Sequence, residues 1–207
     1  MEINLGFIYF NYMFEPINFD HLLGTQGFSD MLLKNHFTLY QGYVTNSNKV
    51  TDALKKLLDE DKLGSPEAAE LRRRFGWEFN GMRLHELYFG NMAKGGVALK
   101  RGEKIAEKIA ADFGSNDAFV KEFKGVGAMR GIGWAVLTYD KLTDRLFNVW
   151  VNEHDVGHLA GTTPILIMDV FEHAFMIDYG LKRADYIEAF YASIDWRVVN
   201  ERLASVK

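Results

Sequence analysis

A short apolar run that ends in a carboxylate and an imidazole is the feature that most constrains this chain. Residues 164–168 read Pro-Ile-Leu-Ile-Met, and an apolar run of this length that begins at Pro is typical of a short buried strand. Asp169 follows directly, and His173 lies four residues further on. A carboxylate and a neutral imidazole are both good ligands of first-row transition metals. The segment therefore indicates a candidate metal site at the end of a strand.

Two further histidines lie in segments that are expected to be helical. His36 and His85 each fall on an apolar helix face, and antiparallel helices joined by a loop near residues 59–65 could place them side by side. With Asp169 and His173 they make a set of three imidazoles and one carboxylate. Such a set can hold one divalent or trivalent ion and leave positions for solvent and a small ligand. Spacing alone does not choose among zinc, iron and manganese.

The composition restricts the class of protein and the chemistry of any metal site. The chain has 207 residues, of which 48% are apolar, and this suits one large or two small globular domains. It contains no cysteine, so a metal must be bound by His, Asp or Glu. The net charge of −4 is unlike the basic face of a nucleic-acid protein. We expect no secretory signal in residues 1–13 and no membrane span, and therefore a cytoplasmic protein without nucleic-acid or membrane partners.

Hydrophobic periodicity and turn signals predict an α+β fold. A helix is expected from Ser29, with a bend between Gly42 and Asn48, and a second helix from Ser65-Pro66 to about Met92. The later elements are expected as helices over 103–112, 115–123, 184–192 and 196–203 and as strands over 134–139, 146–151 and 164–168. We therefore expect an N-terminal α-helical hairpin domain, residues 1–95, and a C-terminal α/β domain, residues 96–207, with a small, roughly three-stranded antiparallel sheet.

Several short motifs, in order along the chain, resemble the iron/manganese superoxide dismutase family. The strongest is Asp-Val-Phe-Glu-His-Ala-Phe at residues 169–175, which is similar to the family's D-x-[WF]-E-H-[AS]-[YF] signature. The others lie at Glu15-Pro16, residues 109–115, 131–135 and 182–186, and Asp195-Trp196. The resemblance extends from about Phe14 to Leu203. It implies superoxide dismutation as the activity.

The resemblance implies one iron or manganese ion per subunit, held by His36, His85, Asp169 and His173. The last three align without adjustment. His36 aligns only if one residue is deleted between it and Tyr43. An ungapped alignment would place Asn35 at the ligand position. We prefer His36, because imidazole is the better ligand and because His36 and Tyr43 would share one helix face.

Further residues around the metal take roles from the same resemblance. Tyr43 resembles the tyrosine that hydrogen-bonds the outer solvent, and Trp134 resembles an aromatic wall of the metal pocket. Family members place an outer-sphere glutamine either four residues before the second ligand, where this chain has Gly81, or before the third strand, where some carry histidine. His154 is the candidate in this second place, with His158 as the alternative.

The resemblance also implies a homodimer or homotetramer. Glu172 resembles the glutamate that reaches the final histidine ligand of the partner subunit, and Arg183 resembles a basic residue near the substrate entrance. Family members usually form a His–Tyr hydrogen bond across the interface, whereas this chain has Leu39 or Tyr40 and Phe175 at those places. The interface network is therefore expected to differ from the usual one.

The expected function is disproportionation of superoxide to dioxygen and hydrogen peroxide at a mononuclear iron or manganese centre. Two alternatives stay open from the sequence: a non-catalytic metal-binding member of the family, and a zinc-dependent hydrolase with the same ligands around a nucleophilic water. The intact ligand set argues against the first alternative. The lack of a Glu in a general-base position argues against the second.

Overall fold

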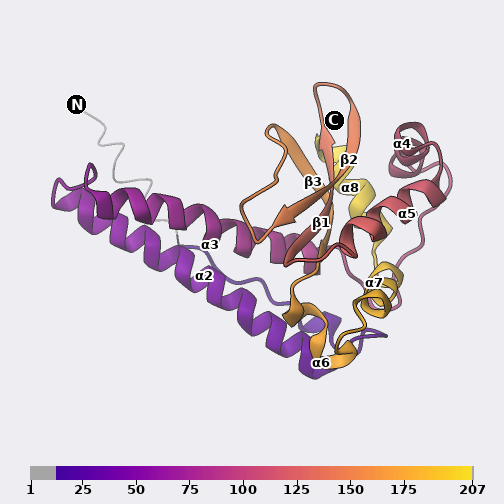
Figure 1. Ribbon diagram of the computed structural model, residues 1–207, viewed down its shortest axis with the longest axis horizontal. Coiled ribbons are helices and arrows are strands. Elements are labelled where there is room, and N and C mark those ends of the chain that lie inside the picture. The colour runs from indigo at the N-terminus through magenta and orange to yellow at the C-terminus, as the bar shows by residue number, and fades with distance from the viewer. Residues whose placement is uncertain (1–12, 207) are drawn as a thin grey trace.

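The chain folds into two long helices, a three-stranded sheet and a set of shorter helices around the sheet (Figure 1). The structure is a computed structural model that describes residues 13–206. Its elements are η1 (Asp20–Leu22), α2 (Asp30–Asp59), α3 (Pro66–Gly90), α4 (Lys104–Phe113), α5 (Asn116–Gly127), β1 (Gly133–Asp140), β2 (Arg145–Asn152), β3 (Thr162–Asp169), η2 (Glu172–Ala174), α6 (Met176–Tyr179), α7 (Arg183–Ala192) and α8 (Trp196–Val206). The expected α+β class is confirmed. The short elements η2 and α6 are additions that the sequence pattern did not predict.

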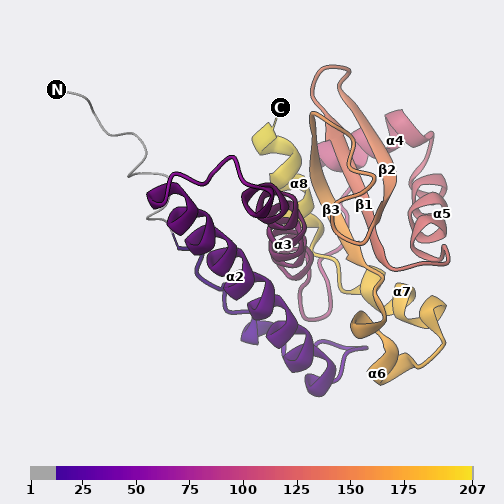
Figure 2. The same cartoon turned by 60° about the vertical axis from the view of Figure 1, so that its left-hand side comes forward.

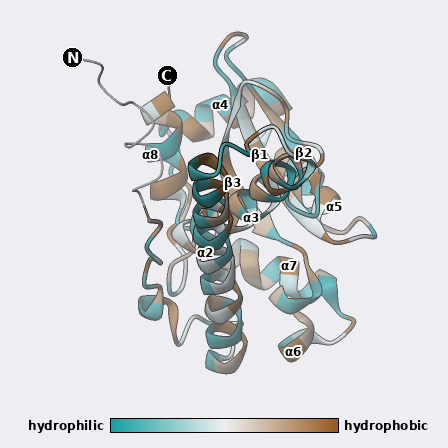
Figure 3. Cartoon of the chain, turned by 90° about the vertical axis from the view of Figure 1, so that its left-hand side faces the viewer, coloured by the Kyte–Doolittle hydropathy of each residue, from teal (hydrophilic) through white to brown (hydrophobic). Residues whose placement is uncertain are grey.

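Helices α2 and α3 form the expected antiparallel hairpin. Each begins at a serine whose hydroxyl accepts a backbone N–H of the first turn: Ser29 accepts from Leu32 at 3.1 Å, and Ser65 accepts from Ala68 at 3.2 Å. The view onto the tip of the hairpin shows mainly hydrophilic residues there (Figure 3). Within residues 13–206, no helix has an apolar stretch long enough to cross a bilayer. The expectation about a secretory signal concerns residues 1–13, of which only Met13 is described.

The expected bend in the first helix is wrong, because α2 runs without interruption from Asp30 to Asp59. The ring of Tyr43 packs against Trp77 and His85 of α3, so tertiary contacts hold the helix through its polar stretch. The amide of Asn48 does not break the helix either. It accepts from the backbone N–H of Phe14 at 2.8 Å and donates to the carbonyl of Phe14 at 2.9 Å, so it ties the preceding segment to the helix.

The sheet lies between two layers of helices (Figure 2). Its strand order is β2-β1-β3 and both pairings are antiparallel, as expected. Helix α3 packs against β3 from one side of the sheet, and α4 and α5 lie on the other side, while α8 contacts both β3 and α4. Pro164 lies in the edge strand β3, where its missing N–H is tolerated. The register pairs Trp134, at the start of β1, with Asp169, at the end of β3, so both side chains belong to the same end of the sheet.

Candidate metal centre

The fold brings together four side chains from the two halves of the chain. His36 comes from the N-terminal half of α2, His85 from α3, Asp169 from the end of β3 and His173 from η2. One ligand atom from each lies within 4.8 Å of those of the other three. The expectation that the hairpin places His36 and His85 side by side is confirmed, since their ring centroids are 5.0 Å apart. Asn35, the alternative to His36, is exposed, whereas His36 is fully buried.

The spacing of the donor atoms suits a single ion. The Nε2 atoms of His36, His173 and His85 lie 3.1, 3.2 and 3.6 Å from the Oδ2 atom of Asp169. Donors that are each about 2.0–2.2 Å from one ion and about 90–120° apart are separated by ~3–3.7 Å. The side chains of His36, His85 and Asp169 are fully buried, but the side chain of His173 is 24% exposed.

Hydrogen bonds around the cluster leave lone pairs directed at its centre. The Nδ1 atom of His85 lies 2.6 Å from the carbonyl oxygen of Gly81, so this nitrogen carries the hydrogen and Nε2 carries the lone pair. That Nε2 atom is buried and has no hydrogen-bond partner among the described residues. The Oδ1 atom of Asp169 accepts from the backbone N–H of Phe171 at 2.8 Å, which leaves Oδ2 facing the histidines. An orphaned buried nitrogen beside a carboxylate fits a bound cation.

At neutral pH, His36, His85 and Asp169 are in the protonation states that a metal requires. Burial lowers the pKa of His36 and lowers that of His85 well below its ordinary value, so both imidazoles are neutral. Burial by itself would raise the pKa of Asp169, but the neighbouring rings of His173 and His36 outweigh it, and the pKa is lowered. Neutral imidazoles and an ionised carboxylate are the ligand forms that bind a divalent or trivalent ion.

A chain of hydrogen bonds leads from Trp134 through His154 to Tyr43. The indole N–H of Trp134 donates to Nδ1 of His154 at 3.1 Å. Because an indole can only donate, neutral His154 must carry its hydrogen on Nε2, and this N–H donates to the hydroxyl of Tyr43 at 2.8 Å. Burial lowers the pKa of His154 to about 4, and burial together with the charge of Asp169 raises the pKa of Tyr43. Both groups therefore keep these forms at neutral pH.

The geometry separates the two histidines that were candidates for the outer sphere. His154 is fully buried and faces Tyr43, whereas Nε2 of His158 donates to the backbone carbonyl of His154 at 3.0 Å. His158 therefore supports the loop and not the cluster. A Cβ atom at Gly81 would lie 2.6 Å from Cδ1 of Tyr43, so this position has no room for the family's other outer-sphere side chain unless Tyr43 moves.

The two remaining candidates do not belong to the cluster. Glu172 is exposed beside His173. The guanidinium of Arg183 donates to the carbonyls of Met129 at 2.6 Å and Gly131 at 2.9 Å, and it lies 5.1 Å from the ring centroid of Phe175. Arg183 thus anchors the loop before β1 and places a positive charge beside that loop.

Two positions next to the cluster were not assigned a role from the sequence. The hydroxyl of Tyr186 donates to the carbonyl of Asp169 at 2.6 Å and so fixes the backbone of that residue. The ring centroid of Trp77 lies 4.6 Å from that of His154. Trp77 precedes Gly81 and His85 by four and eight residues, so helical spacing could have placed it on the same face.

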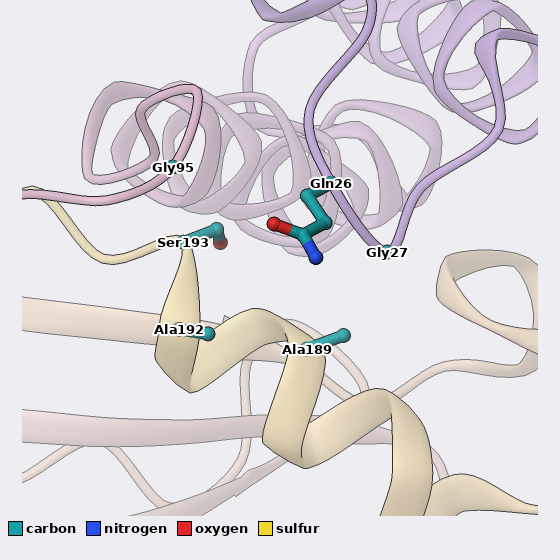
Figure 4. A pocket seen from close by; sticks show the side chains of 6 residues that line it. All are labelled: Gln26, Gly27, Gly95, Ala189, Ala192 and Ser193. Atoms are coloured by element: carbon teal, nitrogen blue, oxygen red, sulfur yellow. The ribbon is translucent and has the colours of Figure 1, made fainter.

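A pocket elsewhere on the surface lacks the chemistry of a reactive site. It has a volume of about 280 Å³ and is lined by Gln26, Gly27, Gly95, Ala189, Ala192 and Ser193. The close view shows the amide of Gln26 pointing into it, among small side chains (Figure 4). None of the four clustered side chains lines this pocket.

Fold and site together define an α+β protein in which three nitrogen donors and one oxygen donor are placed to hold a single metal ion. Comparison with known proteins then gives the family. The C-terminal domain of iron/manganese superoxide dismutases matches residues 100–202, and curated superoxide dismutases match about nine tenths of the chain. The chain belongs to the iron/manganese superoxide dismutase family.

The relatives carry either metal in their names. A manganese superoxide dismutase of Haloferax volcanii is 36% identical over 187 residues, which cover 90% of this chain and 92% of the relative. An iron superoxide dismutase of Aquifex aeolicus is 37% identical over 190 residues, which cover 88% of each chain. An iron superoxide dismutase of Methanothermobacter thermautotrophicus is 35% identical over 181 residues, which cover 86% of each chain. Overall identity therefore does not separate iron from manganese here.

Proposed function

We propose that the protein disproportionates superoxide to dioxygen and hydrogen peroxide at one iron or manganese ion held by His36, His85, Asp169 and His173. The observation that carries this proposal is the convergence of the four donor atoms within 4.8 Å in a member of a superoxide dismutase family. A bound iron or manganese ion would supply the one-electron redox chemistry of both half-reactions. The chain supplies the ligand charge, the pocket and the protons.

The charge of the ligand set suits an ion that changes between two oxidation states. Asp169 contributes one negative charge, and the neutral imidazoles add donors without adding charge. Trp134 is fully buried, and its indole packs edge-on against His85 with the centroids 4.9 Å apart, so it closes one side of the pocket to water. Removal of bulk water strengthens the electrostatic interactions inside the pocket.

Proton supply is assigned to Tyr43 and His154. The formation of hydrogen peroxide from superoxide consumes two protons for each peroxide. The Tyr43 hydroxyl accepts from His154, so its own hydrogen is the one available to an acceptor in the pocket. Tyr43 is partly exposed and packs on His85 at a centroid distance of 5.1 Å, so it connects the pocket with solvent.

The approach of the substrate is assigned in part to Arg183. Superoxide is a small anion and the chain has a net charge of −4, so a local positive charge is needed to raise the encounter rate. The hydrogen bonds of Arg183 to two carbonyls fix its guanidinium without neutralising the charge.

Loading the purified protein with each metal tests this function against its alternatives. Elemental analysis of the native protein is combined with a superoxide-consumption assay on iron-, manganese- and zinc-loaded samples. We expect activity with iron or manganese and none with zinc, because zinc has no redox chemistry. Loaded iron and manganese forms that consume no superoxide would favour the non-catalytic alternative. An activity supported by zinc alone would favour the hydrolase.

The assembly is proposed to be a homodimer, or a homotetramer built from dimers. The support is a patch formed by exposed Glu172, partly exposed His173 and the exposed apolar side chains Met176 and Ile177. A candidate metal ligand that is open to solvent in one subunit is protected if a partner covers it, and exposed apolar patches mark such surfaces. We also propose that the chain divides into the units 1–95 and 96–207 and that the protein is cytoplasmic. Both proposals rest on the sequence expectations above.

A further inference from the structure

Trp77 contacts the hydrogen-bonded pair of His154 and Tyr43 from the side of α3. Its ring meets the His154 ring edge-on, with the centroids 4.6 Å apart, and meets the Tyr43 ring at 5.6 Å. The Phe171 ring stacks on His154 with the centroids 4.9 Å apart. The His154 imidazole therefore contacts two aromatic side chains, one from each half of the chain.

Two groups fix the orientation of the Trp77 ring. Its indole N–H donates to Oε2 of Glu153 at 3.2 Å. The guanidinium of Arg74 lies over the indole at 4.2 Å from the centroid, which is within cation–π distance. Arg74 is itself held by buried Glu78, to which its Nε donates at 2.8 Å. The ring is thus restrained in its own plane by Glu153 and across its face by Arg74.

Glu153 directly precedes His154 and has an uncommon backbone conformation. Its φ of 49° lies in the left-handed region that favours glycine. Its backbone N–H donates to the carbonyl of Ile132 at 3.1 Å. Glycine would adopt this φ without strain, but it has no carboxylate to reach Trp77. Trp77 therefore touches two consecutive residues of the loop, the side chain of one and the ring of the next.

We propose that Trp77, through its hydrogen bond to Glu153, is a positioning residue that holds the His154 imidazole in hydrogen-bond contact with Tyr43. This inference rests on the role in proton supply proposed above for His154 and Tyr43. The Trp77–Glu153 hydrogen bond joins α3 to the loop between β2 and β3. It thereby controls the distance between His154 Nε2 and the Tyr43 hydroxyl. Loosening it lengthens that hydrogen bond and slows proton delivery, with the metal ligands left in place.

The test compares three variants of the metal-loaded, full-length protein. Trp77→Phe removes the indole N–H and keeps an aromatic ring. Glu153→Ala removes the acceptor, and Glu153→Gln keeps an acceptor oxygen at the same backbone position. We expect Trp77→Phe and Glu153→Ala to lower kcat by about tenfold, because proton transfer depends steeply on geometry. Since the encounter with superoxide is unaffected, kcat/KM stays within about twofold, and Glu153→Gln behaves like the parent.

A second readout separates positioning from simple stability. The visible absorption of the iron-loaded protein, titrated with azide as a small anion, shifts in Trp77→Phe and Glu153→Ala if the outer hydrogen bonds have moved. Metal content and unfolding temperature stay at parent values. The inference is overturned if kcat and the azide titration are unchanged in both variants, or if both change only together with metal loss or lower stability. A His154→Leu control, which has no hydrogen-bonding group, with parent kcat would instead remove the proposed role of His154 itself.

Discussion

Gly81 and Tyr43 face each other across the two long helices, and a Cβ atom at Gly81 would lie only 2.6 Å from Cδ1 of Tyr43. The absence of a side chain at Gly81 lets the Tyr43 ring stack on His85, with an interplanar angle of 28°. The same ring position brings the Tyr43 hydroxyl to 2.8 Å from His154. One glycine in α3 thus sets the place of the group that is proposed to deliver protons.

Substitution of Gly81 by alanine is expected to lower activity. In a helix interior this change alone would stabilise the protein by about 1 kcal/mol, but overpacking against Tyr43 costs about 1–3 kcal/mol. Gly76→Ala in the same helix is the matched control, because a Cβ there meets nothing within 4 Å. We expect higher thermal stability and unchanged kcat in Gly76→Ala, with lower kcat and no gain in stability in Gly81→Ala. Equal behaviour of the two variants would show that Tyr43 tolerates a Cβ at position 81.

Asp169→Asn is expected to abolish metal retention while the fold persists. The amide oxygen of Asn can still accept the N–H of Phe171, which Oδ1 of Asp169 accepts at 2.8 Å, so the turn after β3 stays in place. The lost negative charge removes the donor that all three histidines face, and we expect an affinity loss above the roughly 10–100-fold that outer-shell changes cause. Elemental analysis and superoxide consumption measure the result, with exposed His21→Ala as the control. An Asn variant that holds a full ion would contradict the ligand assignment.

The donor side chains could be predicted from the sequence because each stands in a local pattern with its own chemistry. His36 and His85 lie on apolar faces of long helices, and Asp169 ends a run of apolar strand residues. Each of these patterns spans only a few residues. The helical hairpin then needs just one short loop to bring the two histidines together, and that loop is marked by the Ser65-Pro66 helix start.

The surroundings of the cluster could not be predicted in the same way, since they depend on contacts between distant segments. The polar stretch of α2 looks like a break until Asn48 is seen to bind the backbone of Phe14. The place of His154 depends on the positive φ of Glu153 and on Trp77, which lies 76 residues before Glu153 in the chain. Neither a backbone angle nor a contact over that separation has a local signal in the sequence.

Stability at acid pH is expected to depend on His154. Its pKa is about 4 in the folded protein, against 6.5 for the ordinary group, so below pH 6.5 the unfolded chain binds the proton more readily. The contribution to stability is fully present above pH 6.5 and is lost as the pH falls toward 4, by about 3 kcal/mol at most. Denaturant unfolding of metal-free parent and His154→Gln between pH 7 and 4 measures it. The parent should lose more stability than the variant over this range, and parallel curves would exclude the assignment.

Disruption of the exposed patch next to the cluster is expected to yield monomers that lose metal faster. Ile177 is 41% exposed and Met176 is 42% exposed, while the side chain of the proposed ligand His173 is 24% exposed in the isolated subunit. If a partner covers this patch, Ile177→Asp buries an unpaired charge in the interface, which is strongly unfavourable. Sedimentation should then show a dimer or tetramer for the parent and a monomer of 23.7 kDa for the variant. Chelator competition should show faster metal loss from the monomer, because water reaches His173.

Leu142→Asp is the control, since Leu142 is 96% exposed at the tip of the β1–β2 hairpin and lies outside this patch. A parent that sediments as a monomer and still retains its metal would contradict both the interface and its protective role.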